Sequence, residues 1–230
     1  MSNSRSRRRS FLTHLGAGMT VAGAAFAAGD RPAAAQAAGT PFRPGRHAED
    51  AWMDALSGSH RLVIDTTTPH GFAEAVAFAG NFLTASASGY KLTDHDSAVI
   101  IVARHFSTPF AYKDGVWAKY AKVMPPVATM KDPKTGQVPA FNLFNAAGYG
   151  MDLPNFGTTI DAVVGRGVHF AVCQMATQFF AGLLAGQAGN KQAVYDELAG
   201  SLVGNSHMVA AGVVGVNRAQ EYGYTLVSAG

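Results

Sequence analysis

GVHFAVC, at residues 167–173, decides the fold together with QMATQFFAGLL, which follows it at residues 174–184. The first run is almost wholly apolar, which is typical of a strand buried on both faces of a sheet. The second run mixes small and large apolar residues and predicts a covered helix. In a parallel sheet, the carboxyl end of such a strand opens onto the crevice where these folds bind ligands. We therefore expect Cys173, the only cysteine of the chain, to be presented at that site.

Working outward, the same alternation of strands and helices recurs along the chain. Apolar runs predict strands at residues 61–65, 97–104, 208–216 and 224–227, and amphipathic or capped segments predict helices at 68–83, 158–165, 190–202 and 217–222. Thr68 can cap the first of these helices and Pro69 can occupy its first position. The pattern predicts an α/β fold, a three-layer α/β/α sandwich around a mainly parallel five-stranded sheet.

Residues 105–156 interrupt this alternation with six prolines. A connection of this length in a small domain is usually a lid, a binding loop or a partner surface. Because it leaves the second strand at the carboxyl edge of the sheet, we expect it to cover that edge. Its large apolar residues Phe106, Phe110, Trp117 and Phe141 would then close over a pocket.

The first 37 residues resemble a twin-arginine export signal. Arg8 and Arg9 form the pair, a weakly apolar stretch follows, and small residues around 33–37 supply cleavage sites. We expect export through the twin-arginine translocase and a periplasmic or otherwise exported protein, with no stable membrane span after cleavage. Residues 38–58 are interpreted as a linker with a short docking helix, and residues 59–230 as the folded domain.

The net charge of +3 is not a sign of nucleic-acid binding. Five of the 18 basic residues but only one of the 15 acidic residues lie in the first 37 positions, which leaves 13 basic against 14 acidic residues in the body. The body therefore carries no basic surplus that would attract a phosphate backbone.

Motifs for familiar chemistry are missing from the sequence. There is no glycine-rich dinucleotide fingerprint, no Gly-x-Ser-x-Gly elbow and no Cys-x-x-Cys pair. We expect no cofactor. Cys173, His105 and His95 are residue types that could hold a soft metal, but no tight ligand spacing supports such a site, so no metal site is predicted.

Three residues are candidates for a site. Cys173 falls at the start of a helix, where unpaired N–H groups favour a thiolate. His105 follows the second strand and Asp65 ends the first, so a parallel sheet would bring both to the edge that carries Cys173. Each of two residues also has a non-functional interpretation. Cys173 can be a buried, unreactive cysteine of the core, and His105 can be a histidine of a surface loop. His169 shares a strand face with Cys173 and is interpreted as a core histidine rather than a ligand.

The strand ending at Cys173 between two helices, and the segment from Gly212 to Tyr224, resemble the DsrE/DsrF-like sulfur-relay family over about residues 60–228. The resemblance implies a single α/β/α domain, a tendency to form homo-oligomers, and a persulfide carried on Cys173, with a sulfur donor or acceptor protein as partner. The chain differs in having Gln174 after the cysteine, the 105–156 insertion and the export signal. The resulting hypothesis is an exported domain that handles a small sulfur species, as a persulfide carrier or in a sulfurtransferase-like role. The alternative is a non-catalytic periplasmic ligand-binding or protein-interaction domain with a structural cysteine.

Overall fold

The computed structural model describes residues 43–124, 130–186 and 189–230. The predicted signal at residues 1–37 and the start of the predicted linker lie outside the described residues. Residues 44–230 belong to one unit, whose helices and strands alternate along the chain. The 3-10 helices are labelled η below.

The first half of the unit supplies the docking helix and two strands. Its elements are η1 (Ala48–Asp50), α1 (Ala51–Ala55), β1 (His60–Thr66), α2 (Pro69–Tyr90), η2 (Asp94–Asp96), β2 (Ser97–Ala103), η3 (His105–Ala111) and α3 (Asp114–Tyr120). The predicted start of α2 is confirmed, because the Thr68 side chain accepts a hydrogen bond from the Gly71 N–H and Pro69 opens the helix.

The second half supplies the remaining strands. Its elements are η4 (Leu143–Asn145), η5 (Gly150–Asp152), α5 (Ile160–Val164), β3 (His169–Cys173), α6 (Gln174–Ala185), α7 (Lys191–Ala199), β4 (Ser206–Val209), α8 (Gly212–Glu221) and β5 (Thr225–Ala229). The predicted strand at residues 208–216 is wrong beyond Val209, since the chain turns into α8 at Gly212. Gly212 and Gly215 allow α8 to approach the side chains of Arg104 and Val209 closely, and this packing outweighs the strand preference of the intervening valines.

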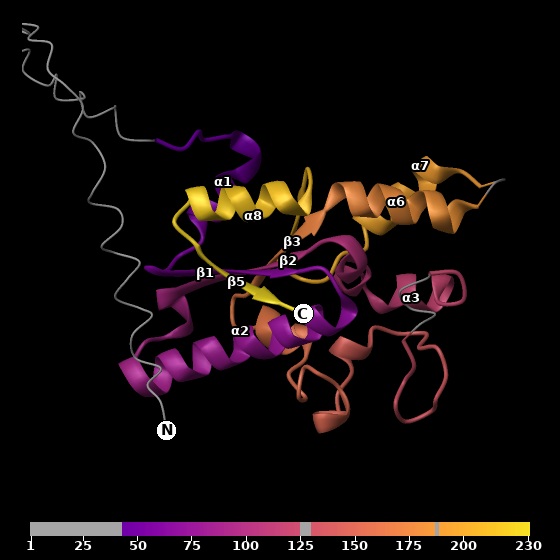
Figure 1. Ribbon diagram of the computed structural model, residues 1–230, viewed down its shortest axis with the longest axis horizontal. Coiled ribbons are helices and arrows are strands. Elements are labelled where there is room, and N and C mark those ends of the chain that lie inside the picture. The colour runs from indigo at the N-terminus through magenta and orange to yellow at the C-terminus, as the bar shows by residue number, and fades with distance from the viewer. Residues whose placement is uncertain (1–42, 125–129, 187–188) are drawn as a thin grey trace, which may run out of the picture. The chain divides into compact units, whose positions relative to one another are not determined.

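The sheet has five strands in the order β4-β3-β2-β1-β5, and every neighbouring pair is parallel. Helices cover both faces, with α1 and α8 on one side and α2 on the other (Figure 1). The predicted α/β sandwich is therefore confirmed. Because all strands run the same way, Thr66, Ala103, Cys173 and Val209 end their strands at one edge.

Two apolar cores fill the spaces between sheet and helices. On the α2 face, Phe72 packs against Phe110, Phe144 and Phe170 with ring centroids 5.7, 6.2 and 5.9 Å apart. On the other face, Val63, Ile100 and other strand residues meet α1 and α8. The strand burial predicted from continuous apolar runs is evident in β2, of which every residue is buried.

The chain leaves β3 and β4 toward opposite faces. Phe180 and Ala181 of α6 belong to the core on the α2 face, whereas Ala219 of α8 belongs to the other core. Adjacent strands whose following helices diverge in this way form a topological switch point, where open α/β sheets bind their ligands. The carboxyl ends of β3 and β4 are therefore the first place to look for a site.

Candidate functional site

A pocket of about 350 Å³ lies at this switch point. Its walls come from the residues after β2, the start of α6 and the start of α8: Arg104, His105, Phe106, Cys173, Met175, Ala176, Phe179, Phe180, Ala211, Gly212 and Val213. A volume near the lower end for ligand sites suits a small molecule. The pocket contains Cys173 and His105 of the predicted site residues, but not Asp65.

Cys173 is both the last residue of β3 and the N-cap of α6. Its Sγ accepts a hydrogen bond from the Ala176 N–H at 3.3 Å, and its carbonyl accepts one from the Thr177 hydroxyl at 3.0 Å. These bonds fix the sulfur over the first turn of the helix. The residue is only 6% exposed, and it lines the pocket.

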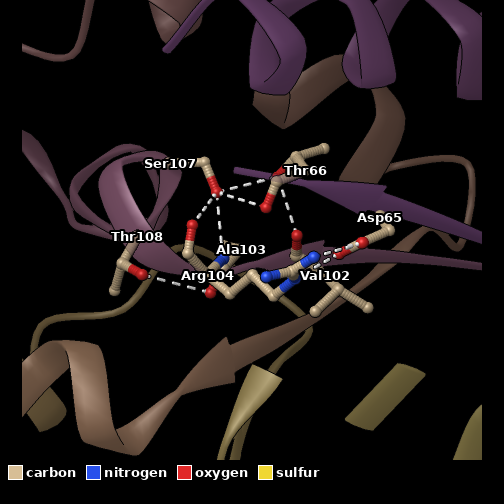
Figure 2. A network of polar contacts seen from close by, with 7 residues as sticks. All are labelled: Asp65, Thr66, Val102, Ala103, Arg104, Ser107 and Thr108. Carbon is tan, nitrogen blue, oxygen red and sulfur yellow. Dashed lines mark hydrogen bonds and ion pairs between the residues drawn. The ribbon is translucent and has the colours of Figure 1, made fainter. Parts of the chain in front are cut away.

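Arg104 is the charged residue in the pocket wall, and sequence reasoning missed it. Its Nε and Nη2 donate to the two carboxylate oxygens of Asp65, each at 2.7 Å (Figure 2). The pKa of Arg104 is raised, first by these hydrogen bonds and then by Coulombic attraction to Asp65 and to Cys173, against burial, which lowers it. Asp65 thus positions Arg104 rather than lining the pocket. The signal in the sequence was a lone arginine directly after the apolar run of residues 98–103.

The turn after Arg104 is held by a buried hydroxyl network, also shown in Figure 2. Ser107 Oγ accepts from the Arg104 N–H at 2.9 Å and lies 2.8 Å from Thr66 Oγ1, which in turn donates to the Val102 carbonyl at 2.7 Å. Both hydroxyls are fully buried. The network connects the ends of β1 and β2 to η3 and so fixes the position of the Arg104 backbone.

His105 takes a left-handed backbone conformation, with φ of 56°. Such a conformation costs a residue other than glycine of the order of 1–2 kcal/mol, and residues of this kind cluster at functional sites. The His105 ring meets Phe106 edge-on, with centroids 4.3 Å apart, and both residues line the pocket. The structure therefore brings His105 to the same pocket as Cys173, as the parallel strands predicted.

The lid predicted for residues 105–156 is mostly wrong. Of the four aromatic residues expected to close over the pocket, Phe106 alone lines it. Phe110 and Trp117 are fully buried in the core on the α2 face, and Phe141 packs against that core. Phe110 packs against Phe72, Phe144 and Trp117, so the segment enlarges the core, where its rings are removed from water, instead of covering the pocket.

Gly212, the first residue of α8, is in close contact with Arg104. A Cβ at this position would lie 2.2 Å from the Arg104 Cβ and 2.8 Å from its Cδ. No side chain fits there without moving the helix or the arginine. The absence of a side chain at Gly212 therefore allows the start of α8 to pack directly against Arg104 in the pocket wall.

His169 contacts His207 of β4, with His169 Nδ1 and His207 Nε2 3.1 Å apart. Trp52 of α1 stacks on His207 with ring centroids 3.9 Å apart. The pKa of each histidine is lowered, mainly by burial, and for His169 also by the neighbouring His207. His169, interpreted from the sequence as a core histidine, is only partly buried and packs against the sheet face under α1, away from the pocket.

The part of the chain that the structure describes contains no cluster of three or more His, Cys, Asp or Glu side chains placed to hold a metal ion. None of the described helices has both the length and the hydropathy needed to cross a membrane. Comparison with known proteins finds no match: no family model, no curated protein and no solved structure is significantly similar to the chain.

Proposed function

We propose that the protein is an exported, DsrE-like domain that carries sulfane sulfur on Cys173. The observation that supports this most is the placement of the only cysteine of the chain in the wall of a pocket at the topological switch point, at the N-terminus of α6. The resemblance of the sequence to the DsrE/DsrF-like family supports the same reading. The arginine pair near the N-terminus supports export.

The surroundings of the sulfur suit nucleophilic chemistry. The Ala176 N–H points at Sγ, the positive end of the α6 dipole lies beneath it, and the positively charged residue Arg104 lines the same pocket. Each of these stabilises negative charge that develops on a reacting thiol. His105, in the same wall, can accept or supply a proton to species entering the pocket.

The transfer itself balances without an added oxidant. The Cys173 thiolate attacks the outer sulfur of a donor persulfide, a sulfur–sulfur bond forms at Cys173, and the bond within the donor breaks. The electron pair leaves on the donor thiolate. Because the chain has no second cysteine, the persulfide on Cys173 is discharged only by another molecule.

The test is sulfur loading followed by intact-protein mass spectrometry. A persulfide donor should add the mass of one sulfur atom to the folded protein, and Cys173→Ser should remove this gain while leaving the thermal transition nearly unchanged. Alkylation shows separately whether the Cys173 thiol of the folded protein can be reached by a small reagent. If a small alkylating agent labels the unfolded protein at once but leaves the folded protein unlabelled over hours, Cys173 is structural and the proposal fails.

A second candidate is a non-catalytic domain that binds a small apolar ligand in the same pocket. The 6% exposure of Cys173 and the apolar character of Phe106, Met175 and Phe179 favour it. In that case the cysteine acts as a small hydrophobic residue in the wall. Cys173→Ala would then retain ligand binding, whereas a sulfur carrier would lose its activity completely.

A further inference from the structure

The walls of the pocket limit the class of sulfur donor that can approach Cys173. Phe106, Met175, Phe179 and Val213 line the pocket and are all more than one third exposed, and Ala176 and Phe180 add apolar wall. Such walls offer few hydrogen bonds to an oxyanion. An anion whose charge lies on hydrated oxygen atoms would lose that hydration without replacement, which is costly.

Arg104 adds little net charge to the pocket. Two of its nitrogens are engaged by Asp65, and its Nη1 donates to no group within the described part of the chain. The paired carboxylate offsets the positive charge of the guanidinium at any distance beyond a few ångströms. The wall therefore suits a singly charged, weakly hydrated anion better than a dianion.

Sulfur chains have these properties. A chain of sulfane sulfur atoms is apolar and polarisable along its length and carries its charge at the end, and sulfur packs favourably against aromatic rings such as those of Phe106 and Phe179. We propose, on the basis of the function proposed above, that the donor which loads Cys173 is inorganic polysulfide in its singly protonated form, the hydropolysulfide anion, which carries one charge at one end. Its chain lies against the apolar wall and its charged end meets Arg104.

The step conserves atoms and electrons. The Cys173 thiolate attacks a sulfane sulfur within the chain, a new sulfur–sulfur bond forms at Cys173, and the next sulfur–sulfur bond of the chain breaks. The electron pair leaves on the shorter hydropolysulfide or hydrosulfide anion, so the donor is itself the oxidant.

The experiment measures the initial rate of sulfur addition to full-length protein with inorganic polysulfide, thiosulfate and glutathione persulfide in turn. Each rate is divided by the rate of free cysteine with the same donor, which removes the intrinsic reactivity of the donor. We expect the normalised rate for polysulfide to exceed the other two by about tenfold, a difference that about 1.4 kcal/mol of selective binding produces. Phe179→Gln should remove most of this preference.

Phe78→Gln is the matched control, because Phe78 is also an exposed phenylalanine but lies on α2 outside the pocket wall. It should leave the preference intact. Equal normalised rates for the three donors would overturn the polysulfide assignment and leave sulfur transfer standing. So would a polysulfide preference that Phe179→Gln does not reduce. If no donor loads folded protein while unfolded protein reacts, the proposed function itself fails.

Discussion

Replacing Gly212 by alanine tests the architecture of the pocket most directly. The new Cβ would lie 2.2 Å from the Arg104 Cβ, which is fixed to the backbone and cannot swing away. Carbon atoms in contact are normally 3.5–4.0 Å apart, so α8 or the turn at Arg104 must shift by more than an ångström. Overpacking of this kind costs about 1–3 kcal/mol.

For a domain of this size, about 2 kcal/mol lowers the thermal midpoint by roughly 4–8 °C. The same shift moves α8 away from Cys173, so the rate at which a small alkylating agent labels the folded protein should rise. Differential scanning fluorimetry and intact-mass alkylation kinetics measure the two effects on one sample.

Gly89→Ala is the matched control. Gly89 is also helical, but an added Cβ there has no neighbour within 4 Å, so alanine should be neutral or stabilise the helix by up to about 1 kcal/mol. If Gly212→Ala keeps the thermal midpoint and the alkylation rate of the unmodified protein, the contact between α8 and Arg104 does not exist, and our account of the pocket wall is refuted.

Three further predictions concern export, the core and pH. Replacing Arg8 and Arg9 together by lysine should leave uncleaved precursor in the cytoplasm, as seen by cell fractionation and immunoblotting; normal processing would contradict the twin-arginine reading. Trp117→Ala should lower the free energy of unfolding, measured in urea titrations, by about 3–5 kcal/mol. The reason is that Trp117 is fully buried and its Nε1 donates a hydrogen bond to the Pro109 carbonyl. A loss below about 1 kcal/mol would mean that the 105–156 segment does not belong to the core. The pKa values of His169 and His207 are lowered in the folded protein. Below the usual histidine pKa of about 6.5, the unfolded protein therefore binds more protons than the folded protein does. The free energy of unfolding should fall as the pH drops from about 6.5 through the folded-state pKa values. His207→Gln should flatten this dependence in urea midpoints taken between about pH 7.5 and 5, and an unchanged slope would show that the pair does not carry it.

The local elements of this protein could be predicted from the sequence because their signals are local. The apolar run at residues 98–103 of β2, the Thr68 cap with Pro69, and the Asn190 cap of α7 each depend on residues a few positions apart. The parallel order of the strands followed from the helices between them. From that order alone, Cys173 and His105 could be placed at one edge of the sheet.

The contacts that build the pocket depend on residues far apart in the chain, and only the tertiary structure decided them. Asp65 and Arg104 are 39 positions apart, and strand register brings them together: Asp65 pairs with Val102, two residues before Arg104. The end of β4 at Val209 was not predicted, because it too depends on a contact between residues far apart in the chain. Nothing local shows that Gly212 must pass close to Arg104, and this contact turns a valine-rich run into a helix. The positions of Phe110 and Trp117 were not predicted correctly, because the hydrophobicity of a ring indicates that it is buried but not which surface buries it. Here both rings lie in the core on the Phe72 face of the sheet.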